Sequence, residues 1–210
     1  MTTPGVYALA ALAAVLLVLA GWRALDRLAD RRAWRALVDA ADGAVPRFDE
    51  ALITDLPAPA QRYFRYTIAP GTPLHSAVEL RMTGELGLGT RAAPGYRPMR
   101  AHQLLAPPHG LVWRLDYGAV GGSDAALPDR AWTRFWLWHV IPVVRVCGDD
   151  HRRSAFGRVV AEAAFWSPAS LLPGPFVRCE AQGDDTARAV VHYGGFTQAV
   201  DITVAADGAP

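Results

Sequence analysis

Glu162 is the residue whose surroundings most suggest chemistry. It is the one carboxylate in the stretch RVVAEAAFWSPASLLPG (residues 158–174), whose apolar spacing predicts a helix over about residues 154–166. A carboxyl group among apolar side chains can act as a general acid or base, because burial favours its protonated form. This role requires a second polar group within reach, and the candidates are His102, His139 and Asp116.

The helical spacing also offers Glu162 a structural role. Arg158 precedes it by four residues, and Phe165 and Trp166 follow it by three and four, so all share one face of the helix. An ion pair between Glu162 and Arg158, beside two aromatic rings, accounts for the carboxylate without catalysis. We favour this interpretation, and the sequence predicts no catalytic residue.

The residue types that are missing exclude several enzyme classes. All 21 basic residues are arginines, and the chain has neither lysine nor asparagine. A Walker A loop, a Schiff-base enzyme and a Ser–Lys dyad all need lysine, and N-glycosylation needs asparagine. Ser123 lies in GGSD rather than in a GxSxG turn, and the histidines and the two cysteines, Cys147 and Cys179, lack metal-binding spacing. We therefore expect no metal and no cofactor.

The aromatic residues suggest a different kind of site. Trp132, Trp136 and Trp138 alternate along a predicted strand, so they share one face, either as core residues or as a wall for an apolar ligand. The candidate ligand-binding residues are Glu162, Trp166, Trp113, Trp136 and Tyr63.

The N-terminal segment has the length and composition of a membrane anchor. Residues 4–22 carry no charge and end in Trp22, and about 20 such residues cross a bilayer as a helix. A cleaved signal peptide is the alternative, but the segment lacks the basic residues that begin such peptides. We predict an uncleaved single-pass anchor over residues 1–22 whose partner is the bilayer.

The distribution of arginines bears on orientation and partners. Five arginines follow the apolar segment closely and none precedes it, which predicts a main domain on the cytoplasmic side. Residues 23–55 are expected to form a juxtamembrane helix and a linker. The helix either packs on its own domain or contacts anionic lipid. The remaining arginines are scattered and the formal net charge is +1, so we expect no nucleic-acid partner.

Residues 56–210 are expected to form an α+β domain. A short helix is predicted over residues 58–66, and the helix near 154–166 separates two groups of alternating strands. No βαβ repeat appears, so the sequence predicts one curved antiparallel sheet with helices on its concave side. The expected strands are 78–88, 97–105, 111–117, 130–138, 143–147, 176–181, 187–193 and 196–204.

Three segments, LPAPAQRYFRY, WTRFWLWHVIPVVRV and SAFGRVVAEAAFWSPASLLPG, occur in the order found in one bacterial family. In these segments the chain resembles a family of unknown function with LPxPVxRYFR-like and EAxWxPxALLP-like motifs, over residues 56–208. The resemblance implies no activity. It also implies further strands after the DG at residues 207–208, so the chain is expected to be short at its C-terminus.

Three functions are compatible with these observations. The first is a membrane-anchored, non-enzymatic domain that binds a lipid or another apolar ligand. The second is an enzyme that uses Glu162 as its acid or base. The third is a structural or interaction module, and we favour the first.

Overall fold

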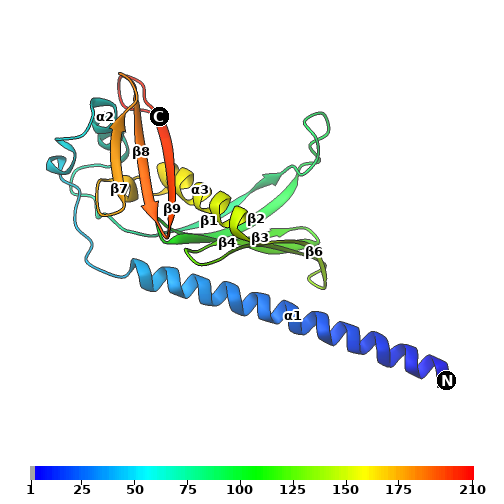
Figure 1. The fold of residues 1–210 in the computed structure, drawn as a ribbon. Helices are drawn as coiled ribbons and strands as arrows, with labels where there is room; N and C mark the ends of the chain where they lie inside the picture. The colour runs from blue at the N-terminus through cyan, green and yellow to red at the C-terminus, as the bar shows by residue number, and fades with distance from the viewer. Residues whose placement is uncertain (1–2) are drawn as a thin grey trace.

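Helix α1 (Thr3–Ala41) joins an apolar segment and a docked segment without a break (Figure 1). The computed structural model of the chain describes residues 3–210. The N-terminal half of α1 is long and apolar enough to cross a membrane, and its most apolar stretch of 18 residues has no buried residue. The other half packs on the domain. Its buried residues recur every three or four positions, as on one face of a helix: Arg23, Asp26, Asp30, Ala33 and Leu37.

A six-stranded antiparallel sheet forms the larger part of the domain. Each strand pairs with the next along the chain, because short turns connect them. Its strands are β1 (Val78–Leu86), β2 (Arg97–Ala106), β3 (Gly110–Tyr117), β4 (Val120–Ala126), β5 (Ala131–Leu137) and β6 (Ile141–Val146).

A second sheet of three antiparallel strands lies at the end of the domain farthest from the chain's N-terminus (Figure 1). Helices α2 (Ala58–Thr67) and α3 (Asp149–Trp166) pack on it around Tyr63, Phe64 and Val160. The remaining elements are η1 (Glu50–Ile53), η2 (Pro168–Leu171), β7 (Val177–Ala181), β8 (Thr186–Tyr193) and β9 (Phe196–Thr203).

The predicted α+β class is confirmed, but the arrangement differs from the prediction in two ways. There are two sheets instead of one, since β7–β9 pair only among themselves within the described residues 3–210. Helices also lie on both faces of the larger sheet, because α1 contacts Ser123 and α3 contacts the adjacent Asp124, whose side chain points the opposite way.

Strand β4 is the strand that the sequence did not predict. Its sequence, VGGSDAA, lacks large apolar residues at alternate positions, so it carries no strand pattern. Gly122 is needed there because the backbone of the neighbouring strand lies close. A Cβ atom at Gly122 would come within 2.1 Å of the Arg134 carbonyl oxygen.

Candidate functional site

A polar cluster joins helix α3 to one face of the six-stranded sheet, and we call it the Arg158 cluster (Arg158, Glu162, Asp124 and Gln103). Arg158 Nε donates to Glu162 Oε1 over 2.6 Å, and Arg158 Nη1 donates to Asp124 Oδ2 over 3.0 Å. The amide of Gln103, whose side chain is fully buried, donates to the other oxygen of Glu162. The predicted ion pair between Glu162 and Arg158 is therefore confirmed, and the sheet adds two partners to it.

The three groups considered as catalytic partners of Glu162 lie on the opposite side of the sheet. His102 bonds to Glu79 over 2.6 Å on the face that α1 covers. Asp116 and His139 line a hollow beside α1. Among the described residues 3–210, Glu162 hydrogen-bonds to Arg158 and Gln103, and this geometry favours a structural role for it.

Two of the candidate ligand-binding residues are fully packed. Tyr63 is 1% exposed and its hydroxyl donates to the carbonyl oxygen of Ala164 over 2.7 Å. Trp136 is 0% exposed and its ring meets that of Trp22 edge-on at 5.7 Å. The prediction that Trp138 shares a strand face with Trp132 and Trp136 is wrong, because Trp138 lies in the turn after β5 with a φ of 49° and is 65% exposed. The prediction is confirmed for Trp132 and Trp136, and α1 covers their face. These side chains therefore belong to packed interfaces.

The other aromatic candidates lie far apart. Trp166 is half exposed and lines a hollow of about 250 Å³ together with Ile68 and Leu74. Trp113 instead lies next to the Arg158 cluster, with the guanidinium of Arg158 5.3 Å from the centre of its ring. The structure thus brings Trp113 and Glu162 together through Arg158, and it does not unite the five predicted residues in one site.

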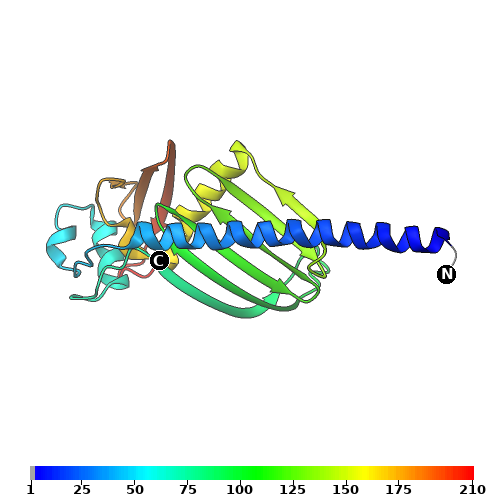
Figure 2. The same cartoon turned by 90° about the horizontal axis from the view of Figure 1, so that it is seen from below.

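Trp113 also belongs to an apolar patch on the α3 side of the sheet. The members of this apolar patch come from strands β1–β5 and are Met82, Leu86, Met99, Ala101, Trp113, Leu115, Tyr117, Val120 and Phe135. Helix α3 crosses only the other end of this face, near the small sheet (Figure 2). Ala101, Leu115 and Tyr117 are buried and the other six side chains are half-buried, so the patch is a small apolar cluster whose outer side chains stay partly open to solvent.

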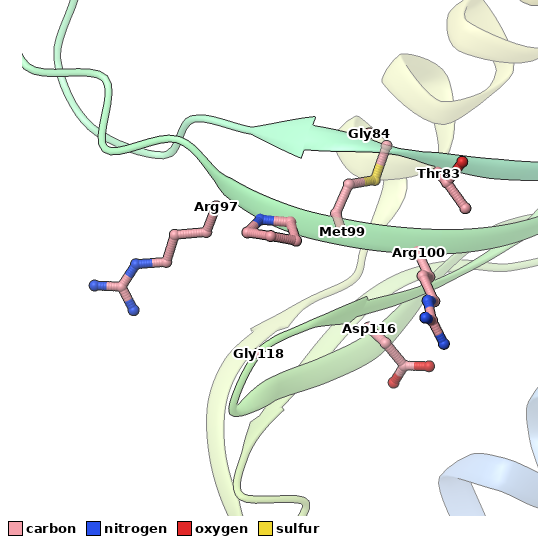
Figure 3. Close-up of a pocket in the computed structure, with 8 residues that line it drawn as sticks. Thr83, Gly84, Arg97, Met99, Arg100, Asp116 and Gly118 are labelled. Atoms are coloured by element: carbon pink, nitrogen blue, oxygen red, sulfur yellow. The ribbon is translucent and has the colours of Figure 1, made fainter.

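A hollow of about 570 Å³ opens where strand β2 passes beyond the turn between β3 and β4 (Figure 3). Met99 points from β2 toward Gly84 of β1, while Arg100 and Asp116 point to the other side of the sheet. The hollow therefore has an apolar edge, which belongs to the apolar patch, and a polar edge toward α1.

Two buried aspartates fix α1 to the sheet, and sequence reasoning missed them. Asp26 accepts hydrogen bonds from both terminal nitrogens of Arg145, at 2.7 and 2.9 Å, and from the indole of Trp136 at 3.0 Å. Asp30 accepts from Ser123 at 2.7 Å and from Trp132 at 3.2 Å. The bond to Asp26 raises the pKa of Arg145. Asp26 and Asp30 are four residues apart and share a helix face with Ala33 and Leu37. This spacing is the sequence signal from which their burial could have been predicted.

These features define a class of protein, namely an α+β domain with two antiparallel sheets, joined to one N-terminal helix that is long and apolar enough to span a membrane. The model of a family described as "Family of unknown function (DUF6544)" matches residues 46–210, which is most of the chain, so the chain belongs to that family. The match includes the linker before α2, upstream of the predicted limit at residue 56. Searches of curated proteins and of solved structures each give no match.

Proposed function

We propose that this protein is a membrane-anchored, non-enzymatic domain that binds a lipid or another apolar ligand on the apolar patch. The observation that carries the proposal is the place of the patch. It lies on the α3 side of the sheet, at the end where α1 leaves the domain toward its apolar segment, and six of its nine side chains are half-buried rather than buried (Figures 1 and 2). Ligand sites are lined mainly by apolar and aromatic side chains such as these, which stay partly open to the ligand.

Contacts near Trp22 support this placement. The guanidinium of Arg145 lies 4.4 Å from the ring centre of Trp22, the last residue of the uncharged segment. Trp136 of β5, whose ring lies 5.7 Å from that of Trp22, is two residues before Trp138 in the turn between β5 and β6. Trp138 is 65% exposed, and Ile141, with which β6 begins, is 44% exposed. The hairpin ends of the sheet therefore lie at the depth where the anchor meets the bilayer surface, and an apolar ligand has a short path to the patch.

Lipid extraction from the full chain, purified in mild detergent, tests the proposal. We expect one lipid class to co-purify, as detected by mass spectrometry. The variant Met99→Glu should reduce its amount at least fivefold, because a carboxylate in the patch must be desolvated when an apolar chain covers it. Leu52→Glu is the matched control, since Leu52 is 49% exposed on η1, away from the patch. Equal lipid retention by wild type and Met99→Glu contradicts the proposal.

The two cysteines provide a test of the proposed cytoplasmic orientation. Cys147 is exposed, whereas burial raises the pKa of Cys179 to about 11, so that the Cys179 thiolate is scarce at pH 8. In a bacterial host, a membrane-impermeant maleimide should label Cys147 only after the membrane is opened. Cys147→Ser supplies the background. Labelling of sealed cells to the same extent as opened cells places the domain on the outer side instead.

A further inference from the structure

The hollow beside α1 that Asp116 and His139 line has a volume of about 270 Å³ and lies between α1 and strands β3 and β4. We call it the arginine hollow, because four guanidinium groups line it. Three of them come from successive turns of α1 and one comes from β3. Its lining includes Arg23, Arg27, Arg31, Arg114, Asp30, Asp116 and His139.

The charges in the arginine hollow are not balanced. None of its four arginines forms an ion pair with a carboxylate of the described chain, residues 3–210, whereas Asp30 already accepts hydrogen bonds from Ser123 and Trp132. Arg114 donates to the carbonyl oxygen of Asp30 over 3.3 Å. Four cations and two carboxylates line the space, so positive charge is in excess there.

Arg23 is the most unusual member of the hollow. It is only 9% exposed, and its Nε and Nη1 atoms are buried without a hydrogen-bond partner in residues 3–210. Its guanidinium lies over the ring of Trp136, 5.5 Å from the centre. An unpaired buried guanidinium is costly, and an anion in the adjoining space lowers that cost by compensating the charge.

The electrostatics of Arg114 agree with a site that lacks a counter-charge. Burial lowers the pKa of Arg114, Asp30 opposes this shift, and the neighbouring Arg31 adds to it. In addition, Arg23, Arg27 and Arg31 are spaced four residues apart on one helix, where like charges destabilise the helix by a few tenths of a kcal/mol per pair. An anion bound between these arginines compensates the buried charge of Arg114 and reduces the repulsion among the three arginines of α1.

The position of the hollow along α1 indicates which anion is available. Arg23 follows the last residue of the uncharged segment directly. Arg27 lies about 6 Å further along the helix, because the rise is about 1.5 Å per residue. The polar layer of a bilayer is roughly 5–8 Å deep on each side, so this end of the hollow lies at the depth of lipid headgroups.

We infer that the arginine hollow is a binding site for a phosphate group, carried by an anionic lipid headgroup or present as free phosphate. Guanidinium groups match phosphate because their planar fork can donate two parallel hydrogen bonds to two oxygens. The volume is several times the roughly 30 Å³ that one water occupies, so the hollow admits a phosphate with an ester group. The site lies on the opposite face from the apolar patch and does not depend on it.

Native mass spectrometry of the detergent-purified full chain tests the inference. The probes are phosphatidylcholine, phosphatidylglycerol and phosphatidate, added at equal concentrations, with inorganic phosphate as a competitor. The test variant is Arg27→Gln/Arg31→Gln, which removes two exposed lining residues. The control is Arg32→Gln/Arg35→Gln, which removes the same charge from the same helix at exposed positions outside the hollow.

We expect the two anionic lipids to bind at least tenfold more than phosphatidylcholine, and the test variant to lose at least fivefold while the control keeps wild-type binding. Inorganic phosphate that raises the melting temperature of wild type but not of the test variant, without preference among lipids, identifies free phosphate as the ligand. Equal losses in the two double variants overturn the inference, because they indicate diffuse attraction. Absence of any response to anionic lipid and to phosphate also overturns it.

Discussion

Replacing Asp26 by alanine is expected to lower the free energy of unfolding by about 3 kcal/mol, because removal of one member of a buried charge pair leaves its partners unpaired. The carboxylate is 5% exposed and is shared by Arg145, at 2.7 Å, and Arg134, at 3.2 Å. It also accepts the hydrogen bond of the Trp136 indole at 3.0 Å. The substitution therefore leaves two guanidinium groups and one indole N–H without their acceptor.

The measurement is denaturant unfolding of the full chain in detergent, combined with hydrogen exchange over residues 23–41. We expect faster exchange in this segment, since Asp26 holds the docked half of α1 on the sheet. Asp39→Ala is the control, because Asp39 lies on the exposed side of the same helix. Asp26→Asn keeps an acceptor for Trp136 and should lose less stability. If Asp26→Ala and Asp39→Ala unfold alike, the aspartate does not fix the helix.

This contact illustrates the part of the structure that the sequence could not predict. Asp26 lies on the buried stripe of α1, so its burial was predictable from its spacing to Asp30 and Ala33. Its partners were not, because Arg134 and Arg145 are more than 100 residues away and nothing local selects them from the chain's 21 arginines. A periodic pattern specifies which side of an element is covered, but not which element covers it.

Among the strands, too, the sequence predicts some elements and misses others. Alternation of side chains predicted β1 and β3 correctly, because a half-buried strand needs apolar residues on one face. Strand β4 was not predicted, because two glycines stand where large apolar residues would have given a strand pattern. The predicted strand 143–147 began after Pro142, yet Pro142 lies within β6, which is an edge strand and therefore tolerates a proline.

The candidate site was predicted least well for a related reason. The pair Arg158–Glu162 is local, so helical spacing predicted it correctly. The apolar patch and the arginine hollow each combine residues from at least three elements that are distant in sequence. The spacing of the arginines on α1 shows that they share one side of that helix. That Arg114 of β3 lies beside them follows only from the fold.

The second large effect is expected at the Arg158 cluster. Arg158→Ala removes the cation that bonds to Glu162 at 2.6 Å and to Asp124 at 3.0 Å, and it also uncovers the ring of Trp113. The carboxylates of Glu162 and Asp124 are then left without their shared counter-charge. Because about a third of the Arg158 side chain is exposed, solvent screens part of this loss, and we expect about 2 kcal/mol of destabilisation.

Arg153→Ala is the matched control, since Arg153 lies on the same helix, is 72% exposed and pairs only with Asp150 among the described residues. A double-mutant cycle with Glu162→Gln measures the coupling of the pair, for which about 1 kcal/mol is expected. In Arg158→Ala/Glu162→Gln, the loss should be smaller than the sum of the two single losses, because the repulsion between carboxylates disappears. Additive losses mean that Arg158 stabilises α3 through Asp124 and Trp113 alone, and that Glu162 is held by Gln103 rather than by its charge.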